Sequence, residues 1–301
     1  MFTDYVYPSP RAVTHSRHSR QRHDGWVSII LLCLLANTSC AHAWGVSDKR
    51  PPKSDVRLKS VDVWPHRIAK RVPHDSEYFT QGLIVGHHSV IESSGLYGRS
   101  FVQRNNRQDG TAEARFTLPE HLFAEGITQY GQQLYLLTWK SERGFILDAK
   151  SLRTLKEFRF QGQGWGITSV GKRLLMSNGS AELSWHRPED FTLLKKTTVL
   201  AGQQPIDKIN ALSYGGGYLW ANVWNQATIL AIDPYTGQIK GRLKLGKLWQ
   251  QQVRGSQENV LNGLSWDESE QALWITGKRW KQRYLLDIQR PQQSAQEAAI
   301  R

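Results

Sequence analysis

The sequence predicts an all-β fold, a five-bladed β-propeller with four-stranded blades, from a repeated three-residue frame and from the absence of helical periodicity. In the frame, a polar or aromatic residue precedes a small residue and then an aliphatic one. The frame occurs five times, as Gln81-Gly82-Leu83, Glu125-Gly126-Ile127, Trp165-Gly166-Ile167, Asn210-Ala211-Leu212 and Asn262-Gly263-Leu264. Successive frames are 44, 40, 45 and 52 residues apart, which is typical of propeller blades. No window sustains the apolar period of a helix.

Each repeat is expected to supply its strands in the same order, with the frame on the innermost strand. The second strands are expected at residues 90–94, 134–138, 174–178, 219–223 and 273–277. Third strands are expected at residues 145–148, 183–185, 229–233 and 284–288. The outer strands at 155–160 and 238–245 carry charge, as blade edges that face water do.

The repeats indicate one domain. A closed all-β ring of this length commonly counts as a single domain, so residues 58–288 are expected to form one β-propeller catalytic domain. The alternating apolar residues at 61–64 predict a strand before the first repeat. Such an N-terminal strand often completes the last blade of a propeller, and we expect it to close the ring. Residues 44–57 would then be a flexible lead and residues 289–301 a disordered tail.

Residues 1–43 have the features of a signal peptide. Four arginines precede an apolar run at 27–36, and Ala41-His42-Ala43 has the small-x-small pattern of a cleavage site. The run is too short to span a bilayer, so no stable membrane insertion is expected. The expected location is periplasmic or secreted, and the alternative is a lipoprotein attached at Cys40. Cleavage after residue 43 removes both cysteines of the chain, so no disulfide is expected.

The chain is basic, with 39 Lys and Arg against 26 Asp and Glu and a net charge of +13. These basic residues are scattered through turns and do not form a stripe, so nucleic acid is not an expected partner. A basic field of this kind would attract acidic peptides or an anionic envelope. We expect the protein to be a monomer.

Two charged residues are candidates for chemistry. Glu125 lies between Ala124 and Gly126 on an innermost strand, so its carboxylate is expected to point inward, either to act on a ligand or to tie two blades together. Aligning the second strands places five residues in one column near a mouth of the ring, namely Gly95, Trp139, Gly179, Trp224 and Lys278. A lysine beside aromatic rings would be desolvated and its pKa lowered, although it could also be an ordinary loop lysine.

The tryptophans divide into two groups. Trp139, Trp165 and Trp224 occupy channel or mouth positions and are expected to be pocket walls, whereas five others are expected in the core: Trp64, Trp185, Trp220, Trp266 and Trp274. The histidines that follow residue 43 show no metal-ligand spacing. The sequence has no Ser-centred elbow, Walker loop or Cys/His zinc signature.

Seven motifs follow one another at blade spacing. They are Phe79-Thr80-Gln81-Gly82, Glu92-Ser93-Ser94-Gly95-Leu96-Tyr97-Gly98, Phe123-Ala124-Glu125-Gly126, Gly164-Trp165-Gly166, Trp220-Ala221-Asn222-Val223-Trp224, Leu261-Asn262-Gly263 and Thr276-Gly277-Lys278. Over residues 73–288 the chain resembles the plant and bacterial type of glutaminyl-peptide cyclotransferase. That family is a five-bladed propeller, unrelated in fold to the zinc-dependent animal type. It is an aminoacyl-type acyltransferase that converts the N-terminal glutamine of peptides and proteins into pyroglutamate with release of ammonia.

The resemblance implies roles for individual residues. Glu125 would transfer protons, Lys278 would be a charge partner at the reacting amide, and Gln81 and Asn210 would be polar contacts to the substrate. The pocket wall would consist of Phe79, Phe123, Trp139, Trp165 and Trp224. We expect no metal and no cofactor. The family commonly has an acidic residue where Ala211 stands and an Asp where Asn178 stands, which leaves open whether the channel holds an ion or ordered water.

Cyclisation suits these residue types. The α-amine, whose pKa is about 7.7–8.0, must lose a proton, attack its own γ-carboxamide and expel ammonia. One carboxylate can accept the proton and return it to the leaving group. The developing oxyanion needs a donor or a positive charge, a role for Lys278 with Asn210 or Gln81 assisting. Because the reaction is intramolecular, aromatic walls would mainly select the folded-back conformer.

Two other functions remain open. A non-catalytic envelope propeller that binds partners through its mouth would be indifferent to mutation of Glu125. A lactonase-like, metal-dependent propeller would need several carboxylate and Asn ligands in the channel, whereas the five frame positions supply one carboxylate. Sensitivity to a chelator would separate the two enzymatic hypotheses.

Overall fold

The computed structural model describes residues 56–252 and 258–290, which belong to one compact unit, Ser47–Arg301. The predicted signal peptide lies outside the described residues, as do most of the predicted lead and tail. In the described part of the chain, no helix is long and apolar enough to cross a membrane.

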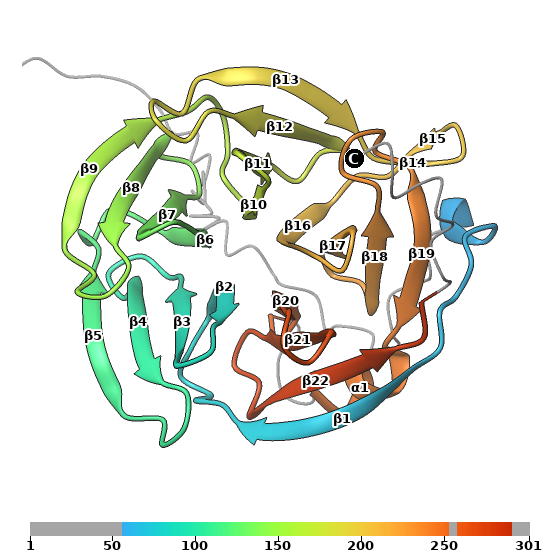
Figure 1. Ribbon diagram of the computed structural model, residues 1–301, viewed down its shortest axis with the longest axis horizontal. Helices are drawn as coiled ribbons and strands as arrows, with labels where there is room; N and C mark the ends of the chain where they lie inside the picture. Colours follow the sequence, from blue (N-terminus) through green and yellow to red (C-terminus); the bar gives the residue numbers. More distant parts are fainter. Residues whose placement is uncertain (1–55, 253–257, 291–301) are drawn as a thin grey trace, which may run out of the picture. The chain divides into compact units, whose positions relative to one another are not determined.

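Five antiparallel sheets of four strands surround a central axis, each with one strand at the axis and one at the rim (Figure 1). Blade 1 contains β2 (Thr80–Val85), β3 (Ser89–Ser94), β4 (Phe101–Asn106) and β5 (Ala112–Thr117). Blade 2 contains β6 (Ala124–Tyr130), β7 (Gln133–Thr138), β8 (Arg143–Asp148) and β9 (Thr154–Arg159). Blade 3 contains β10 (Ile167–Val170), β11 (Arg173–Ser177), β12 (Glu182–His186) and β13 (Leu193–Thr198). The five-bladed, four-stranded propeller predicted from the repeat is thereby confirmed.

Blade 4 contains β16 (Ile209–Gly215), β17 (Tyr218–Val223), β18 (Thr228–Ile232) and β19 (Ile239–Lys244). Blade 5 contains β20 (Leu261–Asp267), β21 (Ala272–Gly277), β22 (Gln282–Ile288) and β1 (His66–Pro73). A small hairpin of β14 (Leu200–Ala201) and β15 (Gln204–Pro205) connects blades 3 and 4. The second, third and outer strands expected from the sequence are all present, with ends that differ by two residues or fewer.

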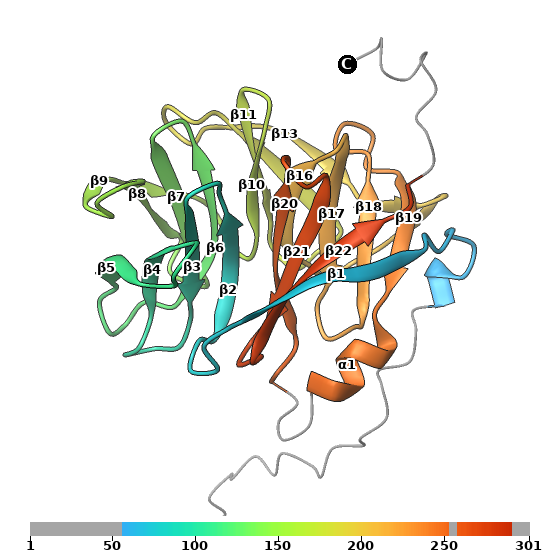
Figure 2. The same cartoon turned by 60° about the horizontal axis from the view of Figure 1, so that its bottom comes forward.

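The outer strand of blade 5 comes from the N-terminal side of the chain. β1 pairs antiparallel with β22, and it crosses the outside of the blade before the chain enters β2 (Figure 2). The prediction of a strand at 61–64 was wrong in position, because the N-terminal strand is β1. That segment makes one isolated bridge, between Val63 and Arg242, and Arg242 also exchanges hydrogen bonds with the main chain of Asp62 and Trp64. It therefore runs along the edge of blade 4 before β1 reaches blade 5.

The five inner strands, β2, β6, β10, β16 and β20, form a closed ring in which each contacts the inner strands of both neighbouring blades. The small frame residues permit this close approach. A Cβ atom on Gly82 would lie 2.7 Å from the amide nitrogen of Ile127, and one on Gly126 would lie 2.6 Å from the carbonyl oxygen of Trp165. The frame residues around the axis leave no space between them for a water molecule. The ring is therefore closed to water at this level.

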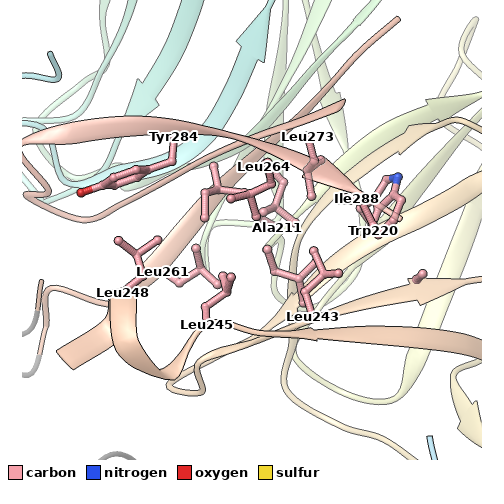
Figure 3. Close-up of a cluster of buried hydrophobic side chains, with 14 of the residues drawn as sticks. Ala211, Trp220, Leu243, Leu245, Leu248, Leu261, Leu264, Leu273, Tyr284 and Ile288 are labelled. Carbon is pink, nitrogen blue, oxygen red and sulfur yellow. The ribbon is translucent and has the colours of Figure 1, made fainter. Parts of the chain in front are cut away.

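The core lies between the blades. Figure 3 shows the largest cluster, in which side chains of β16, β17 and β19 in blade 4 meet those of β20, β21 and β22 in blade 5. The five tryptophans expected in the core, Trp64, Trp185, Trp220, Trp266 and Trp274, are all buried. Trp220 and Trp266 stack in parallel across two blades, with ring centres 5.7 Å apart. Burial of such large apolar surfaces is the main stabilising contribution.

Three short segments differ from the expectations. A helix that the sequence did not predict, α1 (Gly246–Gln252), covers the end of blade 4 and buries Leu248 and Trp249. The last residues of the predicted flexible lead form a 3₁₀ turn (Val56–Leu58), in which Arg57 donates a hydrogen bond to the Pro205 carbonyl oxygen at 2.8 Å. At the predicted tail, the Gln289 amide donates a hydrogen bond to the Pro65 carbonyl oxygen, and the Arg290 side chain donates one to the Gly216 carbonyl oxygen.

Candidate active site

The frame coincides with an irregularity in four of the five blades. The pairing of the two innermost strands shifts register between Thr80 and Gly82, Ala124 and Ile127, Ile209 and Leu212, and Leu261 and Leu264. The first frame residue lies inside each shift, and these residues are Gln81, Glu125, Asn210 and Asn262. Bulges of this kind redirect side chains and are frequent beside active sites. The frame therefore takes four polar residues out of the regular ladder where the inner strands begin.

Glu125 is the second residue of β6, and its side chain is buried, with 6 % of the residue exposed. The tie between blades 1 and 2 is made by its main chain, because the Ser93 hydroxyl donates a hydrogen bond to the Glu125 carbonyl oxygen at 2.6 Å. Burial raises the pKa of the Glu125 carboxyl group to about 8, and the Lys278 charge acts in the opposite direction. No hydrogen bond from another described residue contributes to this shift. The position of the Glu125 carboxyl group near Lys278 is therefore the electrostatic feature of this part of the site.

Lys278 follows β21, and its amide nitrogen donates to the Val260 carbonyl oxygen at 2.9 Å. The residue is 8 % exposed, and its Nζ lies 4.6 Å from the centre of the Phe79 ring. Burial lowers the pKa of Lys278, while the negative charges of Glu125 and Glu258 oppose that effect. The structure therefore brings the predicted acid and the predicted cation within electrostatic reach of each other.

The two predicted amide residues are buried and differ in their partners. Gln81 Oε1 accepts a hydrogen bond from Asn262 Nδ2 at 2.5 Å, which fixes the orientation of the Gln81 amide and leaves its Nε2 as a donor. Asn210 Oδ1 is buried without a hydrogen-bond partner among the described residues. An unpaired buried acceptor costs about 1–3 kcal/mol, so its presence in a folded protein requires an explanation. A ligand that donates to Asn210 would provide one.

The five residues predicted as the pocket wall come from successive blades and form two groups of rings. The ring of Phe123 contacts Phe79 on one side and Trp139 on the other, with centre-to-centre distances of 6.3 and 5.6 Å. Trp165 and Trp224 form an edge-to-face pair at 6.0 Å. Trp224 is the most open of the five, with 38 % of its surface exposed. Together the rings extend from the Lys278 side of the mouth to blade 4.

One residue that the sequence analysis missed joins the two groups. Gln163 Oε1 accepts hydrogen bonds from Trp139 Nε1 at 2.8 Å and from Trp165 Nε1 at 3.0 Å. Gln163 stands two residues before its frame, where Phe79 and Phe123 stand in the first two blades. An alignment of that position across the repeats would have identified it. A second missed residue, Tyr97, lies with its half-exposed ring 5.4 Å from that of Phe123.

The predicted mouth column is present in four of the five blades. In these four blades, the amide of the column residue donates a hydrogen bond to the carbonyl oxygen of the residue two positions before the first frame residue. The pairs are Gly95–Phe79, Trp139–Phe123, Trp224–Lys208 and Lys278–Val260. Blade 3 differs, because there the Gly179 carbonyl oxygen accepts from the Lys208 amide. A Cβ on Gly179 would lie 2.6 Å from the Trp165 ring, and a Cβ on Gly95 would overlap the Phe123 ring. These glycines provide the space that the wall rings occupy.

The two positions at which the family commonly has acidic residues lie in different surroundings. Ala211 is buried and lines the axis, whereas Asn178 is exposed and its Oδ1 accepts from the amide of Ser180 at 3.0 Å. In the described part of the chain, no three His, Cys, Asp or Glu residues are grouped so that they could hold a metal ion.

Comparisons with known proteins point to one family. The sequence model of a family described as glutamine cyclotransferase matches residues 32–288. The chain is 31% identical over 251 residues to a glutaminyl-peptide cyclotransferase of Arabidopsis thaliana, an alignment that covers 82% of this chain and 77% of that protein. The crystal structure of Myxococcus xanthus glutaminyl cyclase is similar, with a TM-score of 0.70 and 27% sequence identity over 76% of this chain and 98% of that one. The chain belongs to the glutamine cyclotransferase family.

Proposed function

We propose that this protein is a glutaminyl-peptide cyclotransferase that converts the N-terminal glutamine of peptides and proteins into pyroglutamate. The observation that carries the proposal is the buried Glu125 carboxyl group within electrostatic reach of Lys278, whose Nζ lies over the Phe79 ring. In the reaction, the α-amine nitrogen forms a bond to the γ-carboxamide carbon, and the bond from that carbon to the amide nitrogen breaks. Ammonia leaves, and the acyl group is transferred within the substrate, which is the chemistry of an aminoacyl-type acyltransferase.

Glu125 is suited to move the proton. The pKa of its carboxyl group, about 8, lies next to the value of about 7.7–8.0 that a free α-amine has. A base and an acid of similar pKa exchange a proton with little energetic cost in either direction. The carboxylate would accept the proton that the amine loses as it attacks. The resulting carboxylic acid would then return it to the departing nitrogen.

Lys278 and the amides would stabilise the charge that develops on the carboxamide oxygen. An ammonium group held in a buried site acts more strongly on such an oxyanion than it would in water. Gln81 Nε2 is a second donor, since its Oε1 is already bonded to Asn262. Asn210 Oδ1 lacks a partner and would accept a hydrogen bond from the substrate amine or amide.

The aromatic wall would fold the substrate. A glutamine side chain must bend back so that its amide carbon meets its own α-amine. Rings from Phe79, Phe123, Trp139, Trp165 and Trp224 would enclose its methylene groups and exclude extended conformers. Selecting a reactive conformer of an intramolecular reaction can supply a large part of a rate acceleration.

The remaining parts of the proposal concern the setting of the reaction. We propose that no metal takes part, since one carboxyl group and one ammonium group suffice for the proton transfer and the charge stabilisation. The arginines, apolar run and small-x-small pattern of residues 1–43 support export to the periplasm or secretion. The proposed enzyme works as a monomer, because one propeller supplies every group named here.

The proposal is tested by mass spectrometry of a Gln-initiated peptide incubated with the purified protein. The wild-type protein should remove the mass of one ammonia molecule from this peptide, and should leave a peptide that begins with alanine unchanged. Glu125→Gln should lower kcat by about 10²–10⁴. Glu182→Gln is the matched control, because Glu182 is exposed on β12 and pairs with Lys196 on β13, the outer strand of blade 3. A wild-type protein that leaves the Gln-initiated peptide unchanged would indicate a binding module instead.

A further inference from the structure

A second buried pair of charged residues lies beside the site and takes no part in the chemistry described above. His74 Nε2 lies 2.9 Å from Glu92 Oε1 and 3.1 Å from Glu92 Oε2, and each side chain is 2 % exposed. Glu92 Oε1 also accepts a hydrogen bond from Thr80 Oγ1 at 2.5 Å. His74 directly follows β1 of blade 5, and Glu92 lies on β3 of blade 1. The pair therefore joins two blades.

The contacts of His74 define its charge. Its Nδ1 lies 2.6 Å from the carbonyl oxygen of Trp280, which can only accept a hydrogen bond. Its Nε2 faces an ionised carboxylate, which likewise only accepts. Both ring nitrogens must therefore carry hydrogen, and His74 is an imidazolium. Burial acts to lower the pKa of His74, but the charge and hydrogen bonds of Glu92 and the Trp280 carbonyl outweigh it and raise the pKa above its usual value.

The imidazolium holds the loop that carries Lys278. Besides the bond to the Trp280 carbonyl oxygen, the amide nitrogen of His74 donates to the Lys281 carbonyl oxygen at 3.0 Å. Trp280 and Lys281, which follow Lys278 in the loop, are thus held by the side chain and the amide of His74. From the same segment, the Arg279 amide donates to the Tyr78 carbonyl oxygen at 2.8 Å. The loop is attached at three consecutive positions to the segment between β1 and β2, which leads to Phe79 and Gln81.

Glu92 connects the same contacts to the substrate side. Thr80, which donates to Glu92, immediately precedes Gln81, and its hydroxyl lies 3.3 Å from the Gly277 carbonyl oxygen. A single carboxylate thereby faces both the segment that presents Gln81 and, through His74, the loop that presents Lys278. Loss of the pair would release both segments at once.

We propose that the ion pair of His74 and Glu92 positions Lys278 against Glu125. His74 and Glu92 are therefore positioning residues for the proposed cyclisation. This inference rests on the proposed function. Neither residue touches the reacting groups. Their contribution is to fix where the Lys278 ammonium lies, and a displacement of about 1 Å in such a group can cost about 10²-fold in rate.

Other charged groups face the pair. Arg283 on β22 is largely buried, and its positive charge favours the ionised form of Glu92 while it opposes that of His74. Tyr78 packs edge-on against His74, with ring centres 5.8 Å apart, and burial raises the pKa of its hydroxyl group, which keeps it neutral. Burial lowers the pKa of Glu92's neighbour Arg283, but an arginine stays charged at any pH at which the enzyme folds. His74 is thus the group of this cluster that loses its positive charge as the pH rises, and its pKa lies above the usual value.

A positioning role has a signature that lost stability alone lacks. The Lys278 charge lowers the pKa of Glu125. If the loop moves away, that influence weakens and the pKa of Glu125 rises. The acidic limb of the profile of kcat/KM against pH should then move to higher pH. The substrate amine titrates identically with every variant, so any shift belongs to the enzyme.

The test compares Glu92→Gln with Asp267→Asn. The control breaks the ion pair of Asp267 with Arg107, at 2.9 Å, which also joins blades 5 and 1 but at the end of the strands opposite the mouth. Kinetics are measured with a Gln-initiated peptide at a temperature at which circular dichroism shows each protein folded. Glu92→Gln should lower kcat about 10- to 100-fold, with a smaller change in KM, and should move the acidic limb upward. Asp267→Asn should lose stability while its pH profile stays that of the wild type.

Two results would overturn the inference. One is a Glu92→Gln protein with wild-type kcat and pH profile, or one that loses stability alone as Asp267→Asn does. The other needs no variant: ¹⁵N NMR of histidine-labelled wild-type protein should find both ring nitrogens of His74 protonated at about pH 6, because its pKa is raised above the usual 6.5, and a neutral ring would contradict the ion pair. An inactive wild-type protein would refute the proposed function, whereas active wild-type protein with unaffected variants would refute only the positioning role.

Discussion

The Glu125 carboxyl group and the Lys278 ammonium group are both buried and act on each other electrostatically. Burial raises the pKa of Glu125 to about 8 and lowers that of Lys278, and each charge opposes the shift of the other. The two groups thus titrate as a linked system. The proton of an attacking α-amine can be taken up by Glu125 in the pH range where that amine is itself half deprotonated.

The first prediction concerns the pH dependence of the wild-type enzyme. Both Glu125 and the substrate amine must lose a proton before reaction, and both do so near pH 8. The value of kcat/KM should therefore rise from about pH 6 to about pH 8.5, and its logarithm should approach a slope of about two on the acidic side. Initial rates of ammonia release at saturating and limiting peptide would show this. A slope of one would mean that Glu125 does not titrate in this range.

Replacing Lys278 should change both the rate and its pH dependence. Lys278→Met keeps the approximate volume and removes the charge, so kcat should fall by about 10²–10³ because the oxyanion loses its cation. The acidic limb should also move to higher pH, since the charge that lowers the pKa of Glu125 is gone. Lys278→Arg is the control that keeps a positive charge and should leave the limb near its wild-type position. If the acidic limb of the pH profile were unchanged in Lys278→Met, the Lys278 charge would not act on the pKa of Glu125.

The space behind the wall rings can be tested with a single methyl group. A Cβ on Gly95 would overlap the Phe123 ring and lie 3.0 Å from Gln81 Nε2, so Gly95→Ala should displace both. Overpacking of this kind costs about 1–3 kcal/mol, and we expect KM to rise about tenfold. Gly86→Ala in the same blade is the control, because its nearest neighbour would be 3.4 Å away. Equal KM values for both variants would exclude a role of Phe123 and Gln81 in substrate binding.

Much of this architecture can be predicted from the sequence because the blade repeats. One frame marks the innermost strand in every blade, and the structure places a register shift at four of the five frames. Counting five residues beyond the start of the second strand then locates Lys278 and two wall tryptophans at one level. The inference works because a residue at a given place in a repeat recurs at a given height along the axis.

The features that could not be predicted lack such a repeat. β1 is an outer strand whose residues are mostly exposed, so it carries no alternation of apolar residues, whereas 61–64 alternates without forming a strand. α1 has seven residues, too few to show a helical period. The ion pair of His74 and Glu92 depends on the contact of blade 5 with blade 1, which no local pattern encodes. That the N-terminal strand is what locks the ring stays a prediction.

Removal of metals should leave the activity unchanged. In the described residues no group of three or more metal-binding side chains is present, and the proposed chemistry needs only Glu125 and Lys278. Dialysis against EDTA followed by assay in metal-free buffer should leave kcat unchanged within the error of the assay. A loss that zinc or calcium restores would favour the metal-dependent, lactonase-like alternative.

The last prediction is the pH dependence of stability that the pair of His74 and Glu92 causes. The pKa of His74 is raised, so its contribution is complete below about pH 6.5 and is lost as the pH rises through the folded-state pKa. The pKa of Glu92 is lowered, so its contribution is present above about pH 4.5 and is lost as the pH falls through its folded-state value. The pair should therefore stabilise most between these limits.

Glu92→Gln should lower the free energy of unfolding by about 3–5 kcal/mol near pH 6, because it leaves His74 buried without its counter-charge. Above the folded-state pKa of His74 the deficit should shrink, since the wild-type ring is then neutral as well. Asp267→Asn provides the contrast, because the partner of Asp267 is an arginine that stays charged, so its deficit should persist at alkaline pH. Urea titrations from pH 4 to 9 would measure both curves. A Glu92→Gln deficit that is smaller near pH 6 than at about pH 9 would contradict an ion pair with a charged His74.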